Sequence, residues 1–165
     1  MLTHPTLERL TVMGFTGMAR AFGELAANAE AERLTHPEWL ALLLDREWSF
    51  RHDRKLAARL RFAKLRHQST PEYSEERSSR GRDRALLVKL IAGDWIAAHD
   101  NCVITGPTGV GKSWLACALG HKACRDDRSV LYQRVPRLFA SLALARGDGR
   151  HARLLRTLGS VQLLI

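Results

Sequence analysis

The sequence of 165 residues lacks most of the features that mark secreted, membrane-spanning or metal-binding proteins. It contains three cysteines, Cys102, Cys117 and Cys124, and none of them stands in a C-x-x-C or Cys/His ligand spacing. Such cysteines are typical of small buried hydrophobic residues in a reducing compartment, so we expect a cytoplasmic protein. No apolar run reaches transmembrane length, and no signal-peptide pattern opens the chain.

Patterns of nucleophilic and metal-dependent catalysis are missing as well. The seven histidines show no metal-ligand spacing, and no Ser/His/Asp or Cys/His nucleophile can be picked out. Acidic residues are also scarce: 17 Asp and Glu face 26 Lys and Arg, which gives a net charge of +9. This excess favours a polyanionic partner, although a basic protein without such a partner can have the same composition. A membrane surface fits less well, because no basic helix also carries a strong aromatic face.

One glycine-rich stretch, in contrast, matches a nucleotide-binding sequence motif at every fixed position. Residues 101–105, NCVIT, are an apolar run with β-branched residues, which predicts a buried strand. The stretch GPTGVGKS follows, and WLACALGHKAC after it predicts a helix. Strand, loop and helix thus match G-x-x-x-x-G-K-[ST] in its required context. The loop consists of Gly106, Pro107, Thr108, Gly109, Val110, Gly111, Lys112 and Ser113.

The residue types of this loop suit a nucleoside triphosphate. Its glycines allow backbone angles and close approaches that a Cβ would block. Successive N–H groups at a helix N-terminus then form a nest for phosphate oxygens. Lys112 would place its charge on the β- and γ-phosphates, and the Ser113 hydroxyl would be a ligand of Mg²⁺. The sequence therefore predicts ATP and Mg²⁺ as cofactors.

Residues 1–68 read as a helical N-terminal domain. A capping box, Thr35-x-x-Glu38, opens a long helix, and Leu40, Leu43, Leu44, Trp48, Leu56, Leu60 and Leu65 form an apolar stripe. The end of this helix is basic, with Asp53 as the one acid among the cations. These cations indicate contact with nucleic-acid phosphates, and a solvated face is the alternative. They are Arg51, Arg54, Lys55, Arg59, Arg61, Lys64 and Arg66.

The rest of the chain reads as a linker and a partial nucleotide-binding domain. Residues 69–84 are polar and broken by Pro71 and Gly81, which predicts a linker. Residues 85–165 then supply a helix as far as residue 100, the loop and its helix, a strand at VLYQRV, two helices and a final strand at SVQLLI. Asp148 is the expected cap of the second of those two helices. The pair carries a second group of cations that faces either DNA, a partner or solvent: Arg137, Arg146, Arg150, Arg153 and Arg156.

Taken together, these motifs resemble one family. The chain is similar to the IstB-type transposition helper ATPases of the AAA+ initiator and helicase-loader group. The resemblance lies in RGRDRALLVKL and DWI before the loop, in ITGPTGVGKSWLACALGHKAC, and in RVPRLFASLALARGDGRHARLLRTLG. The fold class it implies is α/β: a helical N-terminal domain followed by a truncated, AAA+-like P-loop domain of three α/β/α layers.

The resemblance also implies an activity and partners. Such proteins bind ATP and Mg²⁺, self-assemble on DNA and direct a cognate transposase to its target. Their third strand continues into two acids, one for Mg²⁺ and one for the attacking water. This sequence stops at Ile165 without them, so we expect weak nucleotide binding and little or no turnover.

The family's strand order, 5-1-4-3-2, makes a further prediction. Strand 1, residues 101–105, would lack both of its neighbours, while strands 2 and 3 could pair. In the other broad division of P-loop proteins, strand 1 would lie beside the third strand instead. Unpaired buried backbone groups are costly, so the first arrangement predicts an unstable nucleotide half.

Two other functions remain open at this point. A helicase loader would share the fold and differ in the partner it binds. A non-catalytic DNA-binding fragment would use the basic helix and leave the glycine-rich loop idle. The salt dependence of DNA binding and the effect of Lys112→Ala would separate these readings.

Overall fold

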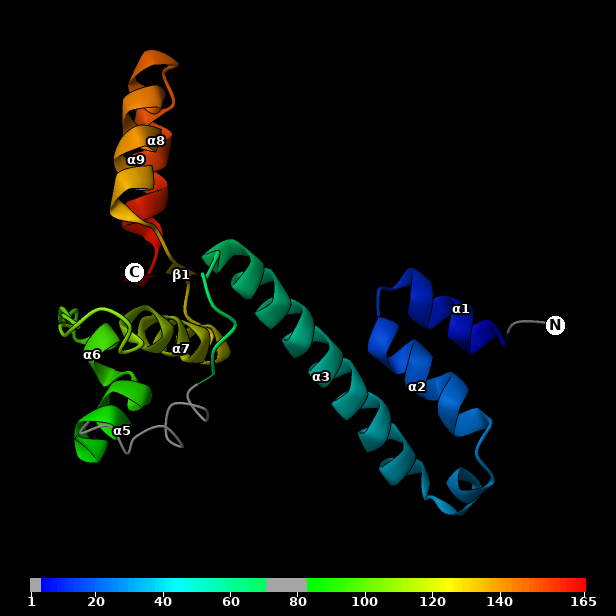
Figure 1. Ribbon diagram of the computed structural model, residues 1–165. Helices are drawn as coiled ribbons and strands as arrows, with labels where there is room; N and C mark the ends of the chain where they lie inside the picture. The colour runs from blue at the N-terminus through cyan, green and yellow to red at the C-terminus, as the bar shows by residue number, and fades with distance from the viewer. Residues whose placement is uncertain (1–3, 71–82) are drawn as a thin grey trace. The chain divides into compact units, whose positions relative to one another are not determined.

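The computed structural model describes residues 4–70 and 83–165, which form two compact units, Met1–Ala57 and Ala58–Ile165 (Figure 1). Most of the predicted linker, residues 71–82, lies outside the described residues. The described part of the chain contains no helix that is long and apolar enough to cross a membrane.

The N-terminal unit is helical, as the sequence predicts. It contains α1 (Pro5–Val12), α2 (Thr16–Ala26), the 3₁₀ helix η1 (Ala29–Arg33) and α3 (His36–Ala63) as far as Ala57. The predicted start of α3 is confirmed, because Glu38 Oε2 accepts hydrogen bonds from the Thr35 N–H at 2.8 Å and from the Thr35 hydroxyl at 2.7 Å. This contact satisfies a donor that the first turn of a helix leaves unpaired.

Within this unit, α2 and α3 approach each other closely at Gly17. A Cβ there would lie 2.7 Å from the Arg46 carbonyl oxygen and 2.8 Å from Phe50 Cβ. The buried Glu47 also joins these two helices. Its carboxylate accepts hydrogen bonds from the Met18 N–H of α2 at 3.0 Å and from Arg51 Nε of α3 at 2.6 Å. Burial opposes ionisation of Glu47, but these hydrogen bonds outweigh it and hold the pKa of Glu47 below its ordinary value.

The predicted apolar stripe of α3 is only partly a core. Leu43 is buried, whereas Leu40, Leu44 and Trp48 are exposed, Trp48 to 69%. The stripe therefore does not form one continuous buried face in the described structure.

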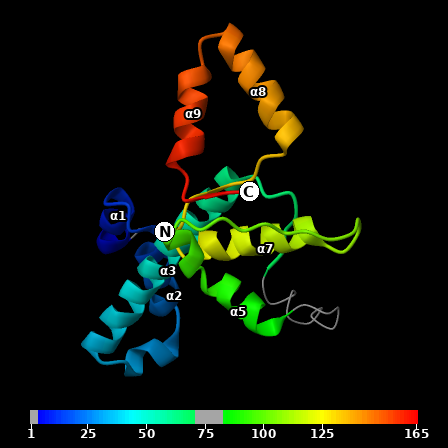
Figure 2. The ribbon, with the colours of Figure 1, turned by 90° about the vertical axis from the view of Figure 1, so that its left-hand side faces the viewer.

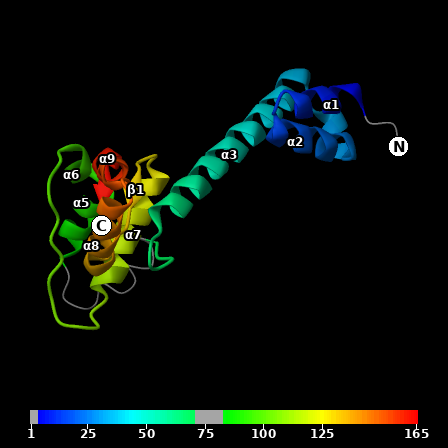
Figure 3. The same ribbon diagram turned by 90° about the horizontal axis from the view of Figure 1, so that it is seen from above.

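In the second unit, α5 (Arg84–Ala92) and α6 (Asp94–Ala97) precede the glycine-rich loop, and α7 (Lys112–Arg125) follows it (Figure 3). Leu87, Leu115 and Leu119 form the core between α5 and α7. The prediction of one helix through residue 100 is wrong. Gly93 ends α5 at φ 81°, in the left-handed region, and Arg128 donates a hydrogen bond to its carbonyl oxygen.

Cysteine burial follows the sequence-based expectation on α7. Cys117 and Cys124 are buried, and burial raises the pKa of the Cys124 thiol, although Arg59 partly opposes the rise. Cys102 is exposed. Among the described residues, no group of three or more His, Cys, Asp or Glu side chains could hold a metal ion.

The sheet of this unit consists of two short parallel strands. β1 (Val130–Leu131) pairs with β2 (Leu163–Leu164) in the register Val130–Leu163 and Leu131–Leu164. The Ile165 N–H extends the ladder to the Leu131 carbonyl oxygen at 2.9 Å. Beside it, the Tyr132 N–H donates to the carbonyl oxygen of Ala63 at 2.8 Å, which ties the end of α3 to the sheet. The predicted pairing of the second and third strands is therefore confirmed.

Residues 101–105 have no regular secondary structure and do not form the predicted strand. Within the described part of the chain, they pair with neither β1 nor β2. Val103 is 82% exposed, and Ile104 alone of this segment packs against the Leu87 core. The prediction of a buried strand is wrong because a strand requires a neighbour for its N–H and C=O groups. The prediction that this segment lacks a neighbour is confirmed.

Two antiparallel helices connect β1 to β2. α8 (Val135–Gly147) and α9 (His151–Ser160) pack side by side and project away from α7 (Figure 2). Pro136 stands in the first turn of α8, as predicted. Asp148 does not cap α9 as expected. The cap residue is Arg150, whose N–H donates to Asp148 Oδ1 at 3.1 Å.

Candidate nucleotide-binding site

The glycine-rich loop depends on backbone angles that other residues rarely adopt. Gly106, Gly109 and Gly111 have φ values of 143°, 86° and 88°. A Cβ at Gly109 or Gly111 would meet nothing within 4 Å, so backbone conformation and not crowding requires glycine there. Gly111 caps α7, and the helix begins directly after it at Lys112. The loop therefore delivers its N–H groups to a helix N-terminus, where partial positive charge gathers.

Lys112 reaches back across the loop. Its Nζ donates hydrogen bonds to the carbonyl oxygens of Gly106 and Pro107, both at 2.7 Å. These bonds hold the ammonium group at the mouth of the loop. Ser113, the next residue on α7, is exposed in the first turn, so its hydroxyl is accessible to a ligand.

A groove of about 960 Å³ extends from this loop. Its lining includes Gly106, Gly111 and Lys112 of the loop and Leu86 and Leu90 of α5. A groove lined by both a cation and apolar side chains suits a molecule that carries phosphates and a flat apolar ring. Asp83 also lines the groove, where it caps α5 by accepting from the Ala85 N–H at 2.9 Å.

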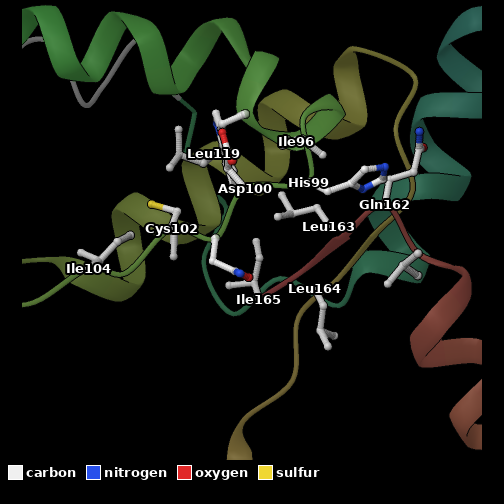
Figure 4. A pocket seen from close by; sticks show the side chains of 14 residues that line it. Ile96, His99, Asp100, Cys102, Ile104, Leu119, Gln162, Leu163, Leu164 and Ile165 are labelled. Atoms are coloured by element: carbon white, nitrogen blue, oxygen red, sulfur yellow. The ribbon is translucent and has the colours of Figure 1, made fainter.

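A second, smaller pocket of about 340 Å³ is lined by side chains of residues 101–105 and of residues 161–165. Figure 4 shows Cys102 and Ile104 on one side of it and Leu163 and Ile165 on the other. The pocket thus separates residues 101–105 from β2. This separation excludes direct pairing of the two in this structure.

In the N-terminal unit, the three predicted DNA-contacting cations differ in their surroundings. Arg51 is bound by Glu47, one turn earlier, and its guanidinium lies 5.2 Å from the ring centre of Phe15. Arg54 and Lys55 are exposed. The sequence analysis counted Asp53 as the one acid at this end of the helix. It did not include Glu47, which lies just before the basic residues.

In the second unit, the remaining candidates are also a mixture. Arg59 forms an ion pair with Asp127 at 2.5 Å, and the separation of 68 residues explains why the sequence did not indicate it. Arg61, Lys64, Arg66 and Arg153 are exposed. The side chain of Arg150 donates to Asp148 Oδ2, at 2.7 Å from Nε, and these hydrogen bonds lower the pKa of Asp148.

The comparison with protein families decides the relationship. The family model of the IstB-like ATP binding proteins matches residues 8–165, which includes the glycine-rich loop and both units. This chain belongs to the IstB-like family. The resemblance stated from the motifs is thereby confirmed, and with it the assignment to an ATP-binding protein of insertion sequences.

Three similar proteins agree with this assignment. The y4pL insertion sequence ATP-binding protein of Sinorhizobium fredii is 76% identical over the whole chain, which spans 67% of that protein. The corresponding protein of insertion sequence IS1162 from Pseudomonas fluorescens is 45% identical, again over the whole chain and 72% of that protein. That of IS21 from Pseudomonas aeruginosa is 34% identical over 86% of this chain and 53% of its own length. The chain therefore spans about half to three quarters of these relatives.

Proposed function

We propose that this chain is the nucleotide-binding part of a transposition helper, which binds ATP with Mg²⁺, assembles on DNA and recruits or regulates a transposase. The observation that carries the nucleotide part is the position of Lys112 Nζ, 2.7 Å from two carbonyl oxygens of a loop that ends at the N-terminus of α7. The named relatives are all described by their insertion sequences, which favours this function over helicase loading.

The residues present fit the proposed cofactors. The loop N–H groups and Lys112 would hold the phosphates, and the Leu86 and Leu90 wall would hold the base. Bound Mg²⁺ would neutralise phosphate charge. One hydroxyl, from Ser113, suffices on the protein side, since Mg²⁺ in such sites takes its other ligands from phosphates and water.

The proposed domains are a helical domain at 1–68, a linker at 69–84 and a partial P-loop domain at 85–165. The pocket between residues 101–105 and β2 supports an AAA+-like three-layer arrangement, because that strand order leaves room for a strand there. The tie between Tyr132 and Ala63 suggests that the last turns of α3 accompany the P-loop domain.

The nucleotide proposal is tested with a fluorescent ATP analogue and Mg²⁺. Removing the ammonium of Lys112 takes away charge-assisted hydrogen bonds, so Lys112→Ala should weaken binding about 10- to 100-fold. Lys89→Ala, which removes an exposed cation outside the groove, is the matched control and should leave affinity unchanged. Equal affinities of all three proteins would refute the proposal. Measurable ATP turnover that Lys112→Ala abolishes would contradict the expectation of little or no hydrolysis.

The DNA part is tested by measuring duplex binding over a range of salt concentrations. If about five phosphates are neutralised, the logarithm of the binding constant should fall with the logarithm of salt at a slope of about −4.5. A helper should also show DNA assembly that Lys112→Ala alters only when ATP is present. Assembly on DNA that depends neither on ATP nor on Lys112 would favour the non-catalytic DNA-binding fragment. DNA binding that does not change with salt would contradict a function on DNA.

A further inference from the structure

A third pocket, of about 620 Å³, lies in the second unit at the end of α3. Two parts of the chain that are distant in the sequence build it: the end of α3 with the residues that follow it as far as Thr70, and His121 of α7. The described residues that line it are Leu60, Arg61, Lys64, Leu65, His67, Gln68, Thr70 and His121. It shares no lining residue with the groove of the glycine-rich loop.

The lining of this pocket is one-sided in charge. Arg61 and Lys64 are cations, His67 and His121 can each donate a hydrogen bond, and no carboxylate is among the described lining residues. The acids at the end of α7 are already engaged, since Asp126 binds Lys122 and Asp127 binds Arg59. A concave set of donors and cations without a carboxylate is suited to an anion.

The walls of the pocket are held in place by contacts outside it. Ser69, which is fully buried, donates from its hydroxyl to the Trp114 carbonyl oxygen at 3.0 Å, so residues 65–70 are fastened to α7. The hydrogen bond from Tyr132 to Ala63 fixes the end of α3. Arg61 and Lys64, although exposed, therefore line a pocket whose walls are held by hydrogen bonds.

A purely structural role for the two cations is the competing explanation. Arg61 lies in the last turn of α3 and Lys64 directly after it, where positive charge stabilises the helix C-terminus. That role requires neither a pocket nor the neighbouring histidines. It also predicts that removing the charges lowers stability and leaves anion binding unchanged.

We propose that this pocket binds one phosphate group, at a site separate from the glycine-rich loop, and that Arg61 and Lys64 contact the same phosphate. The phosphate can belong to a nucleic-acid strand or be a free ion. A phosphate of a nucleic-acid strand rests on the DNA association proposed above, whereas a free phosphate ion does not.

The nucleic-acid source is tested by the salt dependence of duplex DNA binding, with Arg61→Gln, Lys64→Asn and the double variant of the full chain. Asparagine tolerates the φ of 51° at Lys64. Each neutralised phosphate contributes about 0.9 to the slope, so the double variant should reduce the slope by about 1. Each single variant should reduce it by less, because the remaining cation still contacts the shared phosphate. Lys89→Gln is the charge-matched control. A loss of about 2 in the double variant, or effects equal to the control, would overturn the shared site.

The free-ion source is tested with inorganic phosphate on the Lys112→Ala chain, which weakens the glycine-rich loop as a competing site. The imidazole resonances of His67 and His121 should shift on titration, and the shift should be lost in the double variant. His67→Gln is a second variant in case the double variant does not fold, and thermal unfolding verifies folding throughout. Phosphate shifts without a slope change assign a free ion, and the reverse result assigns nucleic acid. If neither response occurs, the pocket is not a phosphate site, whatever becomes of the DNA proposal.

Discussion

Residues 101–105 and 161–165 are both short apolar runs, yet the structure treats them differently. In the second run, Leu163 is buried and its N–H donates to the Ser129 carbonyl oxygen at 3.1 Å. In the first, Val103 is exposed, and the described structure pairs the run with no strand. The difference shows that apolar, β-branched sequence is insufficient for a strand, because the backbone groups also require a partner.

The largest expected difference between the two runs is the loss of stability when a carboxylate is introduced into each of their surroundings. Val130 is fully buried opposite Leu163, so Val130→Asp should destabilise the second unit by more than about 3 kcal/mol. Val103→Asp places the same group in solvent and should change stability by less than about 0.5 kcal/mol. Urea unfolding followed by tryptophan fluorescence measures both. A large loss at Val103 would mean that residues 101–105 are packed in solution.

Amide exchange measures the same contrast without mutation. The N–H groups of Leu163 and Ile165 donate to the carbonyl oxygens of Ser129 and Leu131, so they should exchange at least about 10-fold more slowly than those of Val103 and Ile104. That ratio corresponds to about 1.4 kcal/mol of difference in opening free energy. Slow exchange at Val103 and Ile104 would contradict the unpaired segment.

A contrast of similar size concerns the loop that follows residues 101–105. Gly111→Ala forces a Cβ into the left-handed region and should cost about 1–2 kcal/mol, with weaker nucleotide binding. Gly159→Ala, at an open helical position of α9, should gain about 0.5 kcal/mol. Thermal unfolding of the two variants gives the comparison. Equal effects would show that the loop does not hold the backbone angles described above.

The glycine-rich loop could be predicted from sequence because its residues are consecutive. The spacing of Gly106, Gly111 and Lys112 fixes the order of loop and helix, and local backbone preferences do the rest. The start of α3 at Thr35 was accessible for the same reason. The break at Gly93 carried a local signal too, since glycine commonly ends helices, but the apolar run across it favoured one helix.

Contacts between distant segments could not be predicted in this way. The pairing of Arg59 with Asp127 joins residues 68 positions apart, and both Lys64 and His121 line one pocket. The sequence spacing of the two residues does not predict contact in either pair. The burial of Leu43 beside the exposed Leu44 on one helix likewise depends on which face its neighbours cover.

The sequence by itself determined the family, the loop with its lysine, and most of the helices, because each depends on residues close together in the chain. Tertiary structure decided which apolar run became a strand, which arginines were already neutralised, and where a cavity opened. Those outcomes depend on partners that the fold brings from elsewhere. A hydrogen-bond ladder, an ion pair and a pocket wall each need a second segment of the chain close by. The local sequence does not indicate which segment that is.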